Sequence, residues 1–517
     1  MTWLTRLVIS TSLAMLMVST ARVFTQSPVK MPTECTVAAL QALAPKGTTI
    51  TAATMVAAAG RVPSHCLVDG HTTSVGNEVN FRLGLPREWN GKLYFVGVGG
   101  LGGRIGTLTR GLARGYASAS TDTGHTIDDT TWMSNRAKEI DYGHRGTHVT
   151  AVAAKALTAA FYGRPIAHAY FDGCSNGGRQ ALMEVQRYPN DFDGVIAGNP
   201  STGTAMQLGR ALVYQKMLAK AGYFLTEAAV ELISQATLSA CDKTDGLEDG
   251  LISEPTRCAF DPETLKCAGG KTTGCLNEGQ LSVVRQIYGG AKLPSGEVYA
   301  WGFPAGHEGG STGWRAWISG PEEPQPQPDG TLAYLGGRLP IGFPIAEANM
   351  SGLALEQDDP SFSWRTLKFP ADVARLKTMS EILSPLDADL RPFQKQGGKL
   401  LLYHGWADPA ISANGTVAYF DRVTATVGGP VQADTFARLY LIPGMHHCSG
   451  GPGPNEFDIL TPLELWVEQG VAPGPIVATH RTAGQVDRTR PLCPHPQVAR
   501  YIGTGSIDEA ANFRCAQ

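Results

Sequence analysis

The sequence predicts an α/β fold organised around a parallel sheet, and three observations lead to this prediction. Strand-like and helix-like segments alternate between residues 79 and 198. The turn Gly173-x-Ser175-x-Gly177 lies between a short strand-like run and a helical segment. Two later strand-like runs are followed by loops that carry an acid or histidines. At 517 residues, the chain is long enough for a large core with an insertion or for two domains.

Composition narrows the classes of function. Hydrophobic residues make up 43% of the chain and charged residues 17%, as in a globular protein with a well-filled interior. The formal net charge is −3, so the chain lacks the overall basic character that a polyanion partner requires. We therefore expect no nucleic-acid partner.

The N-terminus reads as a secretory signal peptide over residues 1–21. Arg6 precedes an apolar run from Leu7 to Val18, and the small residues Ser19-Thr20-Ala21 follow. The run is short for a bilayer span, and no later segment has the roughly 18 uninterrupted apolar residues that a membrane helix needs. The expected product is a secreted or periplasmic protein without a membrane span; the alternative is an uncleaved anchor.

Ten cysteines, an even number, indicate disulfides in an exported chain. Three pairs are close enough in sequence to form local loops, and a fourth would staple the mature N-terminal region. Two cysteines, far apart in sequence, are left over, and the sequence alone does not fix the connectivity. The four pairs are Cys241/Cys258, Cys267/Cys275, Cys493/Cys515 and Cys35/Cys66, and the remainder is Cys174 and Cys448.

Residues 28–78 are expected to lead into the core sheet. Residues 79–85 alternate in polarity like a half-buried strand, and residues 92–96 form the next strand. The second strand runs into a glycine-rich loop at residues 97–103. No Lys-Ser/Thr pair follows this loop, which argues against a phosphate cradle. In a serine hydrolase, such a loop would bring a backbone N–H to the oxyanion.

The next segments continue the alternation. Residues 116–125 read as a strand that ends in a polar loop at His125. His125 is a candidate base, although a structural hydrogen-bonding role is the more common one for such a histidine. Residues 146–162 read as a buried helix that stops at Gly163-Arg164-Pro165, and residues 194–198 form another strand. Strand, helix and strand in this order favour a parallel sheet.

After residue 200 the alternation stops. Residues 201–388 contain helical stretches, cysteine-bearing turns, a proline-rich loop and many aromatic residues, so we predict a lid domain here. The catalytic domain would then comprise residues 22–200 and 389–517. Four tryptophans of the lid would either line an aromatic-binding pocket or fill an ordinary core; these are Trp301, Trp314, Trp317 and Trp364.

The sheet resumes with strands at residues 398–404 and 437–442. Each strand is followed by a loop that contains candidate catalytic residues. Asp408 follows the first strand, and His446 and His447 follow the second. Functional groups of open α/β sheets gather at the carboxyl ends of their strands. The chain order Ser175, Asp408, His447 is that of an α/β-hydrolase triad, which makes the α/β-hydrolase fold the predicted class.

With Cys174-Ser175, Asp408 and His447-Cys448 in place, the sequence resembles the tannase and feruloyl esterase family, which includes mono(2-hydroxyethyl) terephthalate hydrolase-like enzymes. The resemblance covers nearly the whole mature chain. It implies that Cys174 and Cys448 bridge and hold the nucleophile and base loops together. His446 departs from the family pattern, which leaves a choice between two histidines, and adjacency to Cys448 favours His447. A rival interpretation makes Cys174 itself a thiol nucleophile.

A second motif lies at residues 241–251. Its three carboxylates, Asp242, Asp245 and Asp249, suit a hard cation such as Ca²⁺, which also accepts backbone carbonyls. The resemblance implies a structural calcium ion in the lid, held also by the carbonyls of Leu247 and Leu251. No glutamate stands at the twelfth position, so this is not an EF-hand loop. The alternative is an acidic surface turn.

The predicted function is a serine carboxylic-ester hydrolase that acts through an acyl-enzyme. Ser175 would be the nucleophile, His447 the base and Asp408 its partner, with backbone N–H groups of Asn176 and Gly100 as the oxyanion hole. The resemblance implies small esters of aromatic acids as substrates, and the residues do not choose between feruloyl, galloyl and terephthaloyl esters. Rival hypotheses are a non-catalytic phenolic- or carbohydrate-binding protein and a serine acyltransferase.

Overall fold

A nine-stranded sheet lies at the centre of the chain. The computed structural model describes residue 1, residues 34–359 and residues 362–517, so the predicted signal peptide beyond Met1 lies outside the described residues. The order of the strands across the sheet is β1-β2-β3-β5-β4-β6-β7-β12-β13. Their bounds, in chain order, are β1 Thr48–Val56, β2 His65–Ser74, β3 Asn77–Pro86, β4 Lys92–Val96, β5 Ala117–Thr121, β6 His168–Cys174, β7 Gly194–Gly198, β12 Lys399–Gly405 and β13 Ala437–Ile442.

The sheet is mixed: antiparallel strands extend the parallel part that the alternation of strands and helices predicts. Strands β5, β4, β6, β7, β12 and β13 pair in parallel, as the alternation with helices predicts. The pairs β1–β2, β2–β3 and β3–β5 are antiparallel. A two-residue turn joins β2 to β3 and a loop over residues 57–64 joins β1 to β2, and connections of this length suit antiparallel neighbours. Residues 28–78 therefore supply two strands that the sequence analysis left within a lead-in segment.

Helices cover both faces of the sheet. Adjacent residues of the buried strands point to opposite faces, so Phe95 and Phe171 enter one hydrophobic core while Tyr94 and Tyr170 enter the other. The first core includes residues of α4 and α5, and the second includes residues of α15. The helices of this part are α1 Val37–Leu43, α2 Thr109–Leu112, α3 Arg136–Ile140, α4 Gly146–Tyr162, α5 Asn176–Arg187, α12 Arg391–Lys395, α13 Ala413–Thr426, α14 Pro430–Ala433 and α15 Leu460–Gln469.

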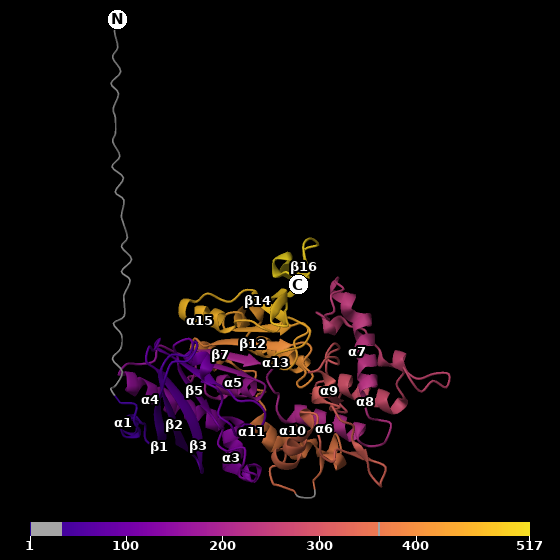
Figure 1. The fold of residues 1–517 in the computed structure, drawn as a ribbon, viewed down its shortest axis with the longest axis horizontal. Coiled ribbons are helices and arrows are strands. Elements are labelled where there is room, and N and C mark those ends of the chain that lie inside the picture. The colour runs from indigo at the N-terminus through magenta and orange to yellow at the C-terminus, as the bar shows by residue number, and fades with distance from the viewer. Residues whose placement is uncertain (2–33, 360–361) are drawn as a thin grey trace.

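The segment between β7 and β12 contributes no strand to the central sheet within the described residues. Its helices gather at the lower right of Figure 1, beside the sheet, and have a hydrophobic core of their own. They are α6 Thr204–Met217, α7 Glu227–Cys241, α8 Glu278–Gly289, α9 Trp314–Trp317, α10 Gly342–Ala348 and α11 Lys377–Leu383. Two small antiparallel pairs belong to this segment, β8 Ala291–Lys292 with β9 Val298–Ala300 and β10 Gln325–Pro326 with β11 Leu332–Ala333.

The remaining elements are short. Single 3₁₀ or π turns occur at η1 Trp132–Ser134, η2 Asp141–Arg145, η3 Asp242–Asp245, η4 Pro255–Arg257, η5 Pro262–Leu265, η6 Asn349–Leu353, η7 Trp364–Thr366, η8 Ala371–Leu376 and η9 Ala510–Asn512. The C-terminal region forms two hairpin-like pairs, β14 Ile476–Thr482 with β15 Gln485–Leu492 and β16 Val498–Tyr501 with β17 Phe513–Ala516. Among the described residues, no helix has the length and apolarity needed to cross a membrane.

Candidate active site

Four neighbouring parallel strands end at one edge of the sheet, and each is followed by a residue of the site. Ser175 follows β6, Asn199 follows β7, Asp408 lies three residues after β12, and His447 lies five residues after β13. Because parallel strands carry their carboxyl ends to the same edge, residues separated by more than 270 positions meet there.

Ser175 sits on a strained turn between β6 and α5. Its φ of 65° and ψ of −123° lie outside the regions that side-chain-bearing residues usually adopt. Its backbone N–H donates to the Gly198 carbonyl at 2.9 Å, which ties the turn to the neighbouring strand. A Cβ on Gly173 would lie 2.5 Å from the Gly177 carbonyl oxygen, so that position requires glycine. The predicted elbow is therefore present in its expected strand-turn-helix setting.

His447 and Asp408 are in direct contact. Nδ1 of His447 lies 2.8 Å from Oδ2 of Asp408. A carboxylate only accepts hydrogen bonds, so the contact places the imidazole proton on Nδ1 and leaves the lone pair on Nε2. Such a ring is able to take a proton from a hydroxyl, and the carboxylate stabilises the resulting imidazolium.

Asp408 is completely buried and held ionised. Burial alone would raise its pKa, but the charge of His447 and hydrogen bonds from His404 and His447 keep the pKa well below its usual range. Asn199 Nδ2 donates to Oδ2 at 2.7 Å, and the backbone N–H groups of Ala410 and Ile411 donate to Oδ1 at 2.7 and 3.0 Å. The carboxylate is thus fixed in position as well as in charge.

His446 points to a different part of the structure. Its Nδ1 contacts Thr312 Oγ1 at 2.5 Å, and its ring lines a separate cavity of about 410 Å³ beside Glu308 and Trp406. Burial is the main reason that its pKa is lowered to about 4. Of the two histidines that the sequence offers, the structure places only His447 against Asp408.

The cysteines form five disulfides, and the described residues include no free cysteine. Cys174 bridges Cys448 across 274 positions, which joins the residue before Ser175 to the residue after His447. This pairing leaves no thiol at position 174, so the rival thiol-nucleophile interpretation is wrong. The other four pairs agree with those suggested from spacing, namely Cys35–Cys66, Cys241–Cys258, Cys267–Cys275 and Cys493–Cys515.

Ser175 and His447 line one cavity of about 370 Å³. Gly100 and Asn176, the predicted oxyanion-hole residues, line the same cavity. Asn176 is the first residue of α5, where backbone N–H groups have no partner within the helix. Gly100 has a φ of 62° in the glycine-rich loop, a conformation that side-chain-bearing residues rarely adopt. Ser175, His447 and the two predicted oxyanion-hole residues therefore line one cavity, while Asp408 is buried behind His447.

The insertion supplies another wall of this cavity. Of the four tryptophans considered from the sequence, only Trp317 is among its lining residues. Its ring meets the imidazole of His447 edge to face, with ring centroids 4.8 Å apart. Trp314 and Trp364 are buried in the core of the insertion, whereas Trp301 is partly exposed and lines a different cavity. Two of these four tryptophans therefore belong to the core of the insertion.

The acidic loop at residues 242–251 is tightly folded. Asp242 accepts hydrogen bonds from the backbone N–H groups of Asp249 and Gly250, and Asp245 accepts one from Leu247. Asp249 pairs with Arg490 at 2.6 Å. Burial raises the pKa of Asp249, the charges of Arg490 and Arg488 lower it, and the charge of Asp245 raises it. The last effect places like charges near one another on this loop.

His125 has a structural setting rather than a place in the cavity. It stacks on Trp132 with ring centroids 3.8 Å apart, and burial lowers its pKa to about 4. The sequence analysis missed three residues that position the site. Asn199 and His404 contact Asp408, and the buried Arg179 donates to Asn176 Oδ1 and to the carbonyls of residues 142 and 143. The position of Asn199 directly after β7 was the one available signal.

The sequence matches one family profile and several known proteins. The family profile described as "Tannase and feruloyl esterase" matches residues 66–516. A mono(2-hydroxyethyl) terephthalate hydrolase of Piscinibacter sakaiensis is 35% identical over 90% of this chain and 87% of its own. A probable feruloyl esterase of Arthroderma benhamiae is 32% identical over 85% of this chain and 82% of its own.

Solved structures show the same likeness. The crystal structure of feruloyl esterase B from Aspergillus oryzae superposes with a TM-score of 0.80 at 25% identity, covering 92% of this chain and 98% of that one. A likeness over this much of both chains includes the insertion as well as the sheet. The α/β-hydrolase fold predicted from the sequence is confirmed.

Proposed function

The chain belongs to the tannase and feruloyl esterase family and is a carboxylic-ester hydrolase, so we propose that it cleaves esters of hydroxycinnamic-type aromatic acids through an acyl-enzyme on Ser175. The observation that carries the proposal is the contact of His447 with a buried, ionised Asp408, at a cavity that Ser175 also lines. These are the parts that nucleophilic catalysis by a serine needs.

The proposed reaction has two halves. His447 takes the proton of Ser175 at Nε2 as the hydroxyl oxygen attacks the ester carbonyl carbon. The ester C–O bond then breaks, and the alcohol leaves with the proton from His447. Water next attacks the acyl-serine while His447 takes a proton from the water. The bond between the acyl carbon and Ser175 Oγ then breaks, His447 returns the proton to Oγ, and the carboxylic acid is released. Asp408 stays ionised throughout and stabilises the imidazolium.

The backbone N–H groups of Asn176 and Gly100 are proposed to donate to the oxyanion. The helix start at Asn176 supports this role because the dipole of α5 also favours negative charge there. Removing one such donor typically costs on the order of 10²- to 10³-fold in rate.

We assign residues 201–388 the role of a lid over the site. The separate hydrophobic core of this segment supports the assignment, as do Met206, Trp317 and Ile345, which line the cavity together with Ser175. These apolar side chains suit the ring of an aromatic acyl group. Trp317 is the proposed contact for that ring because it also touches His447.

A second candidate activity, on mono(2-hydroxyethyl) terephthalate, is favoured by Arg210. Its side chain lines the cavity, donates to Gln207 and to the Ala410 carbonyl, and has no ion-pair partner among the described residues. Terephthalate monoesters carry a free carboxylate, whereas methyl ferulate is neutral. A guanidinium in the cavity would favour the anionic ester. Arg210→Gln should then raise the KM for the terephthalate monoester more than that for methyl ferulate.

One assay panel tests the substrate proposal. Methyl ferulate, methyl gallate and mono(2-hydroxyethyl) terephthalate are hydrolysed in parallel, and kcat/KM is compared. The proposal predicts turnover of methyl ferulate. Absence of turnover of all three would favour the non-catalytic binding protein instead. Product analysis with added alcohol separates hydrolysis from acyl transfer, since a transferase would form the new ester in preference to the free acid.

A structural calcium ion is proposed for the loop at residues 242–251. Asp242, Asp245 and Asp249 would provide carboxylate oxygens, and Leu247 and Leu251 their carbonyls. All of these donors are oxygen atoms, as a hard cation prefers, and Gly246 and Gly250, with φ of 95° and 80°, let the loop curl. The three carboxylates do not lie within 4.8 Å of one another in the described structure, so they would have to draw together around the ion. An ion would also offset the like charges of Asp245 and Asp249. Its role would be to stabilise the lid, because none of these residues lines the cavity with Ser175.

Export to the periplasm or the medium is proposed as the location. Five disulfides support it, because such bridges persist in oxidising compartments. The mass of the mature protein recovered from the periplasm or medium tests the proposal. Cleavage near residue 21 is expected, and a full-length chain retained with the membrane would contradict it.

A further inference from the structure

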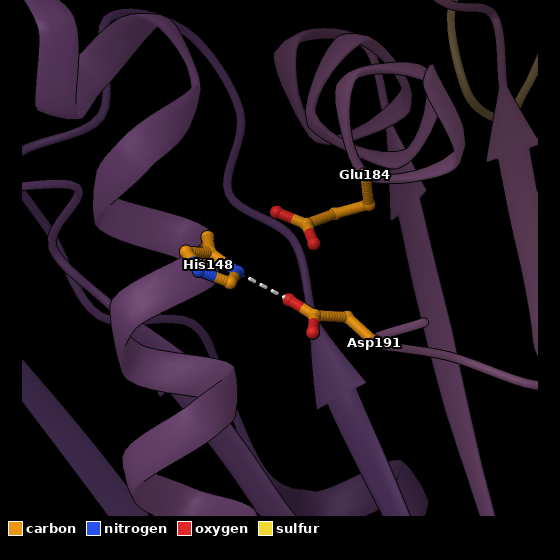
Figure 2. Close-up of side chains that lie close together, drawn as sticks. All are labelled: His148, Glu184 and Asp191. Atoms are coloured by element: carbon orange, nitrogen blue, oxygen red, sulfur yellow. Dashed lines mark hydrogen bonds and ion pairs between the residues drawn. The ribbon is translucent and has the colours of Figure 1, made fainter. Parts of the chain in front are cut away.

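A second cluster of potential ligands lies beside the C-terminal half of α5, the helix that begins directly after Ser175. His148 comes from α4, Glu184 from the C-terminal half of α5, and Asp191 from the loop before β7 (Figure 2). One ligand atom of each residue lies within 4.8 Å of the others, and no other group of three His, Cys, Asp or Glu side chains in the described chain meets that limit. None of the three residues has a role in the proposed ester chemistry.

Glu184 makes this cluster unusual. Its side chain is 1% exposed, and neither of its carboxylate oxygens accepts a hydrogen bond in the described structure, although Asp191 is close enough to share a proton with it. Figure 2 shows the carboxyl group turned toward Asp191 and His148. A buried ionised carboxylate costs free energy unless a bound proton or a cation compensates its charge. A cation bound between the three side chains would provide that compensation.

We propose that His148, Glu184 and Asp191 form a binding site for a first-row divalent transition metal, with Zn²⁺ as the representative ion. The site is independent of the proposed ester hydrolysis and of the calcium loop.

The mix of ligands selects the class of metal. One imidazole nitrogen with two carboxylates suits Zn²⁺ and its neighbours, whereas Ca²⁺ and Mg²⁺ prefer sites made of oxygen alone. The three groups would have to close from their present spacing to metal–ligand distances of about 2.0–2.2 Å. Asp191 Oδ2, now 2.6 Å from His148 Nδ1, would exchange that hydrogen bond for the metal. A fourth position would be left to water.

The surroundings support such a site. The ring of Tyr188 stacks on His148 with centroids 3.8 Å apart, which fixes the plane of the imidazole. His148 is about one-third exposed, so an ion has a route from solvent. Lys155 lies nearby, with Nζ 2.6 Å from the Asp191 carbonyl and 3.9 Å from its carboxylate. One positive charge against two carboxylates still leaves the cluster able to hold a divalent ion.

Glu184 lies nine residues after Ser175 on α5, or about 13 Å along the helix. The ion would tie α4 to α5 and act on stability rather than on the ester bond.

The test measures Zn²⁺ binding directly. Full-length mature protein is treated with chelator, re-equilibrated with saturating Ca²⁺ so that the lid loop does not take up Zn²⁺, and titrated with Zn²⁺. Bound metal is counted by mass spectrometry of the protein after desalting, and the melting temperature is followed in parallel. The inference predicts one bound equivalent and a rise in melting temperature with Zn²⁺ concentration. Replacing Zn²⁺ by Co²⁺ should give visible absorption bands from the site.

Matched variants locate the ion. His148→Ala and Glu184→Gln should each weaken binding at least tenfold, while His447→Ala, which changes a histidine outside the cluster, should keep it. Should Glu184→Gln fail to fold, His148→Ala decides, because its side chain is partly exposed. The inference is overturned if the wild-type protein binds no Zn²⁺, which would mean that Glu184 simply keeps its proton. Equal binding by His148→Ala would also overturn it.

Discussion

A disulfide between Cys174 and Cys448 joins the loop that carries Ser175 to the loop that carries His447. The Cα atoms of the two cysteines lie 6.0 Å apart although 274 positions separate them, and they flank Ser175 and His447. The bridge closes a loop that contains the whole insertion, and the chain-entropy model credits such a loop with about 5 kcal/mol of stability. The more sensitive quantity is the distance between serine and histidine, because a displacement of about 1 Å is able to cost on the order of a hundredfold in rate.

The first prediction is that this bridge matters more for activity than for folding. The double variant Cys174→Ala, Cys448→Ala should stay soluble and folded by circular dichroism and lose most of its turnover. Removing both cysteines avoids a free thiol that would mispair. The control is Cys493→Ala, Cys515→Ala, which opens a bridge away from the cavity and should keep turnover. Full activity in the Cys174→Ala, Cys448→Ala variant would refute this role of the bridge.

The second prediction separates the two adjacent histidines. His447→Ala should lower kcat by on the order of 10⁴-fold or more, since triad members act as a unit. His446→Gln should stay within about tenfold of the wild-type rate, because its ring contacts Thr312 and not Asp408. Steady-state kinetics on one aromatic ester compares the two. A large loss confined to His446→Gln would reverse the assignment.

The third prediction concerns stability in acid. The pKa of His446 is lowered to about 4 in the folded chain, against about 6.5 when unfolded. Between these values the unfolded chain binds a proton that the folded chain does not, so stability falls as the pH falls from 6.5 to 4. The contribution is up to about 3 kcal/mol. His446→Gln lacks this group and should lose less stability over that window. Denaturant unfolding of both proteins at several pH values measures this difference. An equal loss of stability in the wild-type protein and in His446→Gln between pH 6.5 and 4 would contradict the prediction.

The fourth prediction concerns calcium. Chelation should lower the melting temperature, because an ion that binds only the folded lid stabilises it by mass action. Asp245→Asn should reproduce the shift and become insensitive to chelator. Asp245 is the better choice over Asp249, which also pairs with Arg490. Glu248→Gln is the control, since Glu248 is exposed on the same loop but outside the ligand pattern. Protein purified without chelator that holds no stoichiometric calcium would end this proposal.

Much of the fold was predictable because its signals are local. The helix at residues 146–162 and the strand at residues 194–198 have the predicted bounds, since each is uniform in character and ends at glycine or proline. Strands β1 and β2 were missed as elements. β1 is exposed over much of its length, and its sequence shows no regular alternation of apolar and polar residues. It forms a strand because it pairs with β2, and that pairing is not visible in its own sequence.

The residues of the candidate site also differ in how far the sequence predicts them. Ser175, Asp408 and His447 stand in motifs with recognisable neighbours, so the sequence pointed to them directly. Asn199 and His404 hold Asp408 only through tertiary contacts, and a polar residue beside a strand is too common to single out. The tryptophans show a further limit of prediction from the sequence. Trp317 lines the cavity while Trp314 is buried in the insertion core, although both lie on one short helix. Which face of that helix meets the cavity depends on packing, which spacing does not encode.

The most direct test of the account is the turnover of Ser175→Ala. The hydroxyl contributes little to packing, so the variant should fold and melt like the wild-type protein while losing at least about 10⁴-fold in kcat on methyl ferulate or whichever ester of the panel proves best. Circular dichroism and the melting temperature supply the control for folding. A folded variant with almost no turnover is the predicted result, and near-normal turnover would contradict the serine mechanism.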